Sequence, residues 1–102
     1  MAAEDISTNA PDLTWVYLQY TDDMGHRYGN SPEMDAAVQE ADRQLGEIWN
    51  AVRNREENHN EEFLLIVTTD HGRAVGGFHH GGQSDAEREF CIASNSKFNK
   101  RF

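Results

Sequence analysis

The feature that most constrains the fold is the stretch Phe63–Ser84, which reads FLLIVTTDHGRAVGGFHHGGQS. Its apolar run over residues 63–69 ends abruptly at Asp70-His71-Gly72. A run of this kind, bounded by a polar turn, predicts a strand buried on both faces of a sheet. In open parallel sheets, ligands bind just beyond the carboxyl ends of the strands. An adjacent Asp and His there supply one hard oxygen and one imidazole nitrogen, a ligand pair suited to zinc or manganese.

A second strand is predicted earlier in the chain, at Leu13–Tyr20, where LTWVYLQY is rich in β-branched and aromatic residues. We expect a polar loop to follow over residues 21–30, and this loop contains Asp22 and His26. Both predicted strands therefore end in an Asp and a His.

A helix is predicted between these strands. Ser31 can cap its free amides, Pro32 suits the first helical position, and the helix should end within the polar residues 54–60. Gly46 is expected to let the helix pack closely on a strand. Apolar residues at spacings of three and four predict the face that packs on the sheet: Met34, Ala37, Val38, Ala41, Leu45, Ile48 and Val52.

The order strand, helix, strand predicts a right-handed βαβ unit with parallel strands. Both Asp/His loops would then lie at the same edge of the sheet. A third short strand is predicted at residues 88–94, without a readable direction. The predicted fold class is α/β, a βαβ unit of a mostly parallel sheet plus this strand. We divide the chain into a flexible lead-in (1–11), a partial metal-binding core (12–94) and a tail (95–102).

Composition excludes several classes of function. The 102 residues carry a formal charge of −9, which disfavours binding to a nucleic-acid polymer. No stretch approaches the roughly 18 apolar residues of a membrane helix. The lone Cys91 excludes an internal disulfide, and its apolar neighbours predict a buried thiol. The oligomeric state is left open.

Four of the five histidines lie in the two Asp/His regions, and we expect the fifth, His59, to be exposed to solvent. This clustering predicts a metal site. Two divalent ions about 4 Å apart would clamp a phosphoryl group. The candidate ligands are Asp22, His26, Asp70, His71 and His80.

The three motifs DDMGHRYG, TTDHG and HHGGQSDAERE together resemble the type I phosphodiesterase/nucleotide pyrophosphatase branch of the alkaline phosphatase superfamily. The resemblance spans about residues 12–94 and implies an alkaline-phosphatase-like core. It also implies two divalent ions, zinc or a related ion such as manganese, and hydrolysis of phosphodiesters or phosphomonoesters. The implied substrates are small phosphate esters. The sequence leaves the compartment open, and the resemblance favours an exported parent protein.

The resemblance also implies roles for particular residues. Asp22, His26 and His80 resemble the ligands of the first metal ion, and Asp70 and His71 resemble the paired ligands of the second.

Four further residues lie next to these motifs. Asp23 and His79 are each one position from a ligand, and we expect them to support the site without binding metal. Glu87 and Arg88 are expected to hold the glycine loop or to lie near the substrate.

The resemblance further implies an upstream Asp and a Thr or Ser nucleophile. Neither position is matched here, because Thr14, Thr21, Thr68 and Thr69 fall elsewhere in the pattern. No catalytic residue is therefore assigned, and we expect this chain to be the C-terminal part of a catalytic core.

Several alternatives stay open. The main one is a non-catalytic remnant that binds divalent metal, or an interaction module for a partner chain. A sulfatase is disfavoured because Cys91-Ile92-Ala93-Ser94 lacks the sulfatase motif. A cofactor-independent phosphoglycerate mutase fits the DxxGH loop less well. A mononuclear iron oxygenase could use two His and one carboxylate, but such ligands usually sit on a β-barrel.

Overall fold

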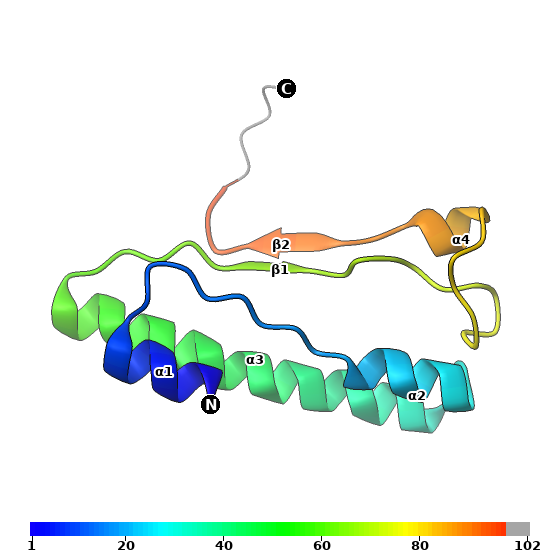
Figure 1. The fold of residues 1–102 in the computed structure, drawn as a ribbon, viewed down its shortest axis with the longest axis horizontal. Helices are drawn as coiled ribbons and strands as arrows, with labels where there is room; N and C mark the ends of the chain where they lie inside the picture. Colours follow the sequence, from blue (N-terminus) through cyan, green and yellow to red (C-terminus); the bar gives the residue numbers. More distant parts are fainter. Residues whose placement is uncertain (98–102) are drawn as a thin grey trace.

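The computed structural model describes residues 1–97; the end of the predicted tail, 98–102, lies outside the described residues. The molecule is flat, with extents of 45 × 35 × 17 Å. Figure 1 shows three helices side by side in one layer and two short strands in the other. In chain order the elements are α1 (Ala2–Asn9), α2 (Tyr20–Tyr28), α3 (Pro32–His59), β1 (Ile66–Thr68), α4 (Asp85–Arg88) and β2 (Ile92–Ser94).

The long helix α3 begins where the sequence predicts. The Ser31 Oγ accepts a hydrogen bond from the backbone N–H of Met34 at 3.2 Å, and Pro32 occupies the first turn. The helix ends at His59, within the range 54–60 where the sequence predicts its end. An ion pair between residues four apart supports its last turns, because Arg53 and Glu57 approach to 3.5 Å on its exposed side.

The small hydrophobic core lies between α1 and the second half of α3. Ile6, Ala51 and Val52 are buried there. Helix α1 therefore lies where we expected a flexible lead-in. Burial of the Ile6 side chain against α3 favours the ordered helix over a frayed chain end. The boundaries of the predicted core and tail stay predictions.

The predicted contact between α3 and a sheet is only partly correct. Of the apolar stripe, Ala37 and Val52 are buried, but Val38 is 51% exposed. Gly46 is not a point of close packing, because a Cβ added there would meet nothing within 4 Å. The other helices cover α3 more than the strands do.

The α/β class is confirmed, but the only ladder among residues 1–97 is antiparallel. Strand β1 pairs with β2 in the register Ile66↔Ser94, Val67↔Ala93 and Thr68↔Ile92. The strand predicted at 63–69 is therefore shorter than expected, and its side chains are exposed instead of buried on both faces. The strand predicted at 88–94 is reduced to β2, because Arg88 belongs to α4 and residues 89–91 belong to no helix or strand.

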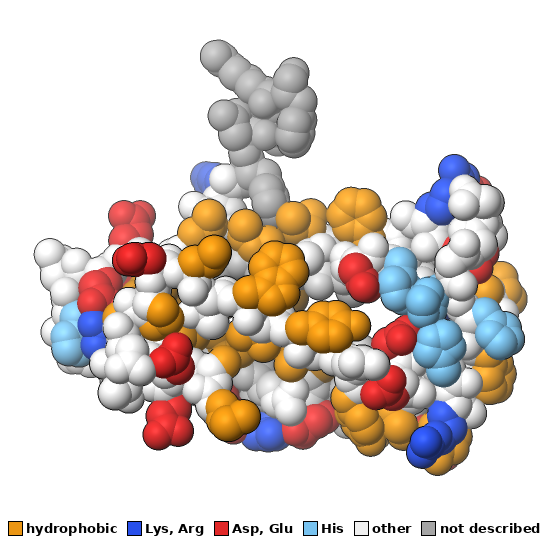
Figure 2. Space-filling view, viewed as in Figure 1, with side chains coloured by type: hydrophobic (Ala, Val, Ile, Leu, Met, Phe, Trp, Pro, Cys, Tyr) orange, Lys and Arg blue, Asp and Glu red, His pale blue; other side chains and the backbone are white. Residues whose placement is uncertain are grey.

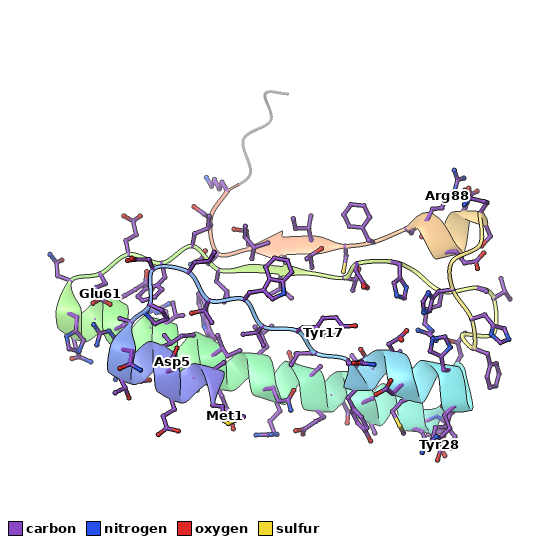
Figure 3. All side chains as sticks on the ribbon, in the orientation of Figure 1. Met1, Asp5, Tyr17, Tyr28, Glu61 and Arg88 are labelled. Atoms are coloured by element: carbon purple, nitrogen blue, oxygen red, sulfur yellow. The ribbon has the colours of Figure 1, made fainter. Side chains whose placement is uncertain are left out.

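The strand predicted at Leu13–Tyr20 is wrong. Residues 13–19 belong to no helix or strand and are exposed, with Trp15 85% accessible. Figure 1 shows this segment running in the same direction as β1, and Figure 3 places Tyr17 on it, between the helical layer and the strands. A strand is completed by hydrogen bonds to a neighbour, and the described residues provide no neighbour here. The βαβ unit is therefore absent from the described residues.

Apolar side chains consequently remain on the surface. Figure 2 shows them over the middle of one face, while a cluster of histidines lies toward one end. Cys91 is exposed, contrary to the prediction of a buried thiol, and its Sγ lies 3.8 Å from the Thr69 Oγ1. Within residues 1–97, no helix combines the length and the apolar character needed to cross a bilayer.

Candidate metal centre

The first two side chains of the centre lie on α2, in the region predicted to be a loop. The acidic pair Asp22 and Asp23 stands in the first turn and His26 and Arg27 in the last, an arrangement that complements the helix dipole. These residues thus favour a helix where the sequence analysis predicts a loop. Because residues four apart share one helix face, the His26 Nε2 lies 3.3 Å from the Asp22 Oδ2.

The third side chain, His80, is brought to α2 by the glycine loop that follows β1. The Asn30 N–H donates to the Gly76 carbonyl at 2.8 Å, just beyond the end of the helix. Gly29 has a φ of +63°, and a Cβ there would lie 2.5 Å from the Phe78 ring. The contact therefore requires glycine for both its backbone conformation and its small size. It docks the loop on α2 immediately before His80.

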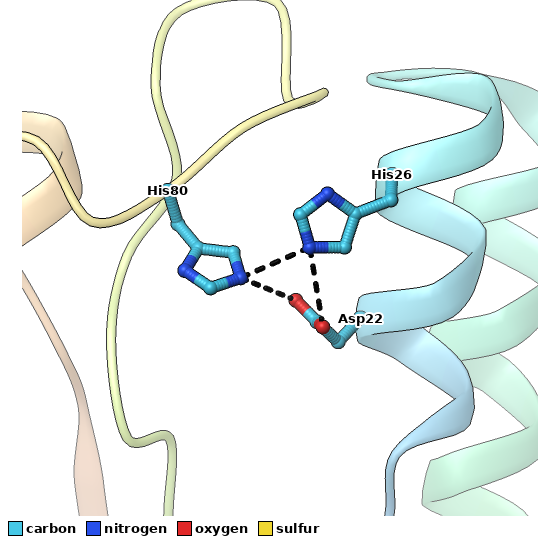
Figure 4. A group of neighbouring side chains, drawn as sticks. All are labelled: Asp22, His26 and His80. Atoms are coloured by element: carbon cyan, nitrogen blue, oxygen red, sulfur yellow. Dashed lines mark hydrogen bonds and ion pairs between the residues drawn. The ribbon is translucent and has the colours of Figure 1, made fainter.

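Asp22, His26 and His80 converge (Figure 4). The two histidine Nε2 atoms lie 3.0 Å apart, and the His80 Nε2 lies 3.3 Å from the Asp22 Oδ1. Zinc bonds of about 2.0–2.1 Å in tetrahedral geometry place neighbouring ligand atoms about 3.3 Å apart. The two histidines approach different oxygens of Asp22, and with one ligand atom from each residue the three atoms lie within 4.8 Å of one another. The donor types suit zinc, and small side-chain adjustments would bring the three atoms to its tetrahedral spacing.

The tautomer of His26 also suits metal binding. Its Nδ1 lies 2.8 Å from the Phe78 carbonyl oxygen, which can only accept, so Nδ1 carries the proton and donates it. In the neutral form of the ring, the nitrogen that faces Asp22 and His80 is then the unprotonated Nε2. A backbone carbonyl that fixes the far nitrogen in this way is a common support for metal-bound histidine.

Asp22 is held in its ionised form. Burial is the largest single effect and raises the pKa of this carboxyl. The Arg73 hydrogen bond, the charge of Arg73 and the charges that His26 and His80 carry when protonated together lower it by more. The pKa of Asp22 therefore lies below its ordinary value. The Arg73 Nη1 donates to the Asp22 Oδ1 at 2.5 Å. Sequence reasoning missed Arg73, although its place directly after Asp70-His71-Gly72 was a usable signal.

The predicted second pair of ligands lies at the edge of this cluster. The His71 ring stacks on the His80 ring at 3.8 Å between centroids, and the His71 Nε2 lies 3.9 Å from the Asp22 Oδ1. The His71 Nδ1 donates to the Gly72 carbonyl at 2.7 Å. Asp70 is 72% exposed, with its Oδ1 3.4 Å from the His71 Nε2. The structure thus brings His71 to the cluster and leaves Asp70 at its rim.

The remaining candidates lie around the three central side chains. The Asp23 carboxylate accepts a hydrogen bond from Gln19 at 3.3 Å on the exposed side of α2. His79 is exposed and its ring lies 6.5 Å from that of Phe78. His59 is exposed at the end of α3, as predicted.

Glu87 holds the glycine loop, as expected. Its carboxylate accepts from the backbone N–H groups of Gly82 and Ser84, at 3.0 and 3.2 Å, and completes a capping box at the start of α4. These bonds lower the pKa of Glu87, chiefly through the Ser84 hydroxyl. Arg88 pairs instead with Asp85 at the surface and projects outward from α4 in Figure 3.

Comparison with known proteins gives consistent matches. An uncharacterized pyrophosphatase/phosphodiesterase of Schizosaccharomyces pombe is 34% identical over 65 residues, which is 63% of this chain and 13% of the relative. Venom phosphodiesterases 2 and 1 of Crotalus adamanteus are each 38% identical over 63 residues, 61% of this chain and 8% and 7% of theirs. No solved structure matches the chain.

The chain spans about an eighth or less of the length of these relatives. The family model for type I phosphodiesterase/nucleotide pyrophosphatase matches residues 1–80, which is most of the chain. That stretch contains Asp22, His26 and His80 together with Asp70 and His71. The chain therefore belongs to the type I phosphodiesterase/nucleotide pyrophosphatase family.

Proposed function

We propose that this chain carries the metal-binding part of a hydrolase that acts on small phosphodiesters or phosphomonoesters. The observation that carries the proposal is the convergence of Asp22, His26 and His80 from two distant stretches of sequence, with donor types that suit one zinc ion. Family membership supports the class of reaction.

Asp22, His26 and His80 would hold the first ion, through one carboxylate and two imidazole Nε2 atoms. His71 and Asp70 would hold a second ion beside it, because the stacked His71 ring already directs its Nε2 toward Asp22. Zinc suits this donor set, and manganese is the second choice. When bound, such ions offset the charge of a phosphoryl group and polarise it toward attack.

The residues of this chain supply binding and orientation, and the nucleophile is expected from elsewhere. The hydrogen bonds of the three central side chains go to Arg73, to the Phe78 carbonyl and to one another, not to a Ser or Thr hydroxyl, within residues 1–97. This same observation favours the second candidate, a chain that binds divalent metal without catalysing hydrolysis.

A zinc titration by calorimetry, followed by a hydrolysis assay, tests the proposal. We expect two zinc ions per chain and one after His71→Ala, with little hydrolysis of bis(p-nitrophenyl) phosphate by this chain alone. Addition of the upstream part of the family domain should restore hydrolysis. Zinc binding that hydrolysis never follows would support the non-catalytic candidate. A chain that binds no zinc would contradict both.

A further inference from the structure

We propose that Arg73 is a positioning residue of the metal centre, and that Gly25 is glycine because it leaves room for the Arg73 guanidinium. The inference rests on the proposed function, since it concerns the same site. It is carried by the contacts of Arg73 with α2 and with the glycine loop.

Arg73 joins the two stretches of chain that form the centre. Its Nη1 donates to the Asp22 carboxylate, while its Nε donates to the Gly77 carbonyl at 2.6 Å. Its Nη2 lies 3.5 Å from the Phe78 carbonyl. The side chain is only 15% exposed. A largely buried guanidinium therefore ties α2 to the loop segment directly before His80.

Through these contacts, Arg73 helps to hold all three central side chains in place. Arg73 binds Asp22 directly, and the Phe78 carbonyl that it approaches is the acceptor of the His26 Nδ1 proton. Gly77 and Phe78 precede His80 in the loop. Loss of Arg73 would therefore free the carboxylate and loosen both histidines. A carboxylate has about four acceptor positions, so Asp22 can accept from Arg73 and still bind a metal ion.

Gly25 lies where the guanidinium crosses α2. It is buried, and a Cβ there would lie 2.6 Å from the Arg73 Cζ and 2.7 Å from its Nε. Glycine is unfavourable inside a helix, and the φ of Gly25 is not positive, so backbone conformation does not require it. The space needed by Arg73 accounts for glycine at this position.

Arg73 also has an electrostatic effect that disfavours zinc binding, because its positive charge repels a nearby divalent ion. Two substitutions separate the effects. Arg73→Met removes the charge and the hydrogen bonds, and Arg73→Lys keeps the charge but loses the planar fork of donors. If positioning dominates, both weaken zinc binding. If repulsion dominates, Arg73→Met strengthens it.

The experiment measures zinc affinity by calorimetry and stability of the metal-free chain by denaturant titration. We expect Arg73→Met and Arg73→Lys to weaken zinc binding about 10- to 100-fold, the range for residues that orient metal ligands. Arg43→Met is the matched control, because Arg43 is an exposed arginine paired with Glu40 and Glu47 on α3. It should leave zinc affinity unchanged.

The contact with Gly25 is tested by a double-mutant cycle. Gly25→Ala should weaken zinc binding in the wild type but add nothing in the Arg73→Met background, where its effect on stability should turn neutral or favourable. Gly46→Ala controls for helix propensity, since a Cβ there meets nothing within 4 Å. Unchanged or tighter zinc binding by Arg73→Met would overturn the positioning role of Arg73 and leave the proposed function standing. Additive effects of the two substitutions would overturn the explanation of Gly25. Absence of zinc binding by the wild type would overturn the proposed function as well.

Discussion

The Nε2 atoms of His26 and His80 lie 3.0 Å apart, although 54 positions separate the two residues in the sequence. The His26 Nδ1 donates its proton to the Phe78 carbonyl, so in the neutral ring the Nε2 that faces His80 is an acceptor. Asp22 adds a carboxylate to the same point. Three groups that can all bind a proton or a cation thus face one another, and this arrangement is the basis of the predictions about zinc binding.

The neighbouring histidines of the glycine loop should differ in their effect on zinc binding. His80→Ala removes a direct ligand. The loss of zinc affinity should therefore be larger than the loss of about 10- to 100-fold that is typical when a residue supporting a ligand is removed. His79→Ala is the matched control, because His79 is exposed and lies outside the cluster. Calorimetry of both variants checks this. Equal losses from the two substitutions would refute the assignment of His80.

The acid stability of the protein should depend on Asp22. The pKa of this carboxyl is lowered in the folded state, so its contribution is fully present above its ordinary pKa of 3.8. That contribution is lost as the pH falls through the lowered folded-state value. Denaturant titration should therefore show that Asp22→Asn costs more stability at about pH 7 than at about pH 2.5. A cost that does not change between these pH values would contradict the prediction.

Gly46→Ala should stabilise the protein. The position lies inside α3, and a Cβ there meets nothing within 4 Å, so only the helix propensity changes. The expected gain is about 0.5–1 kcal/mol in the free energy of unfolding. Urea denaturation followed by circular dichroism measures it. A loss of stability would show that Gly46 has a packing role after all.

Removal of the cap of α3 should have the opposite effect. Ser31→Ala deletes the acceptor of the Met34 N–H, and the expected loss is about 1 kcal/mol. Ser31→Asp restores an acceptor and should recover most of that loss. The same urea titration compares the two variants. If both behaved alike, the cap would not contribute through its hydrogen bond.

The extended segment over residues 13–19 should promote self-association. It is unpaired and apolar, and such a segment offers an edge to another chain. Trp15→Lys should therefore reduce association measured by sedimentation. Val75→Lys is the control, because Val75 is 96% exposed but lies in a turn outside this segment. An equal reduction by the control would show that general surface hydrophobicity causes the association.

The sequence predicts local features of this fold better than its sheet. The start of α3 follows from Ser31 and Pro32, whose capping is a local interaction. The segment at 13–19 has strand-forming residues, yet a strand also needs a partner, which local sequence does not reveal. Helix α2 was missed because residues 21–30 were interpreted as a loop, although the acidic first turn and the terminal Gly29 are helix signals.

The proximity of Asp22, His26 and His80 could be anticipated although the elements that carry them were not, and metal binding by these residues stays a prediction. Asp22 and His26 stand four apart, so a turn or a helix would place both on one side, and the error about the loop did not matter. Convergence with His80 depends on the docking of the glycine loop on α2, which the motif spacing alone suggested. Arg73 was missed because its contact with the site is long-range: it binds Asp22, which lies 51 positions earlier in the sequence.

The most direct test of the metal centre is an NMR titration that follows the imidazole nitrogens of all five histidines as Zn²⁺ is added. We predict that the Nε2 signals of His26 and His80 shift on zinc binding, while those of His59 and His79 stay in place. Shifts confined to His59 and His79, or no shifts with zinc in excess, would contradict the assignment of Asp22, His26 and His80 as a metal site.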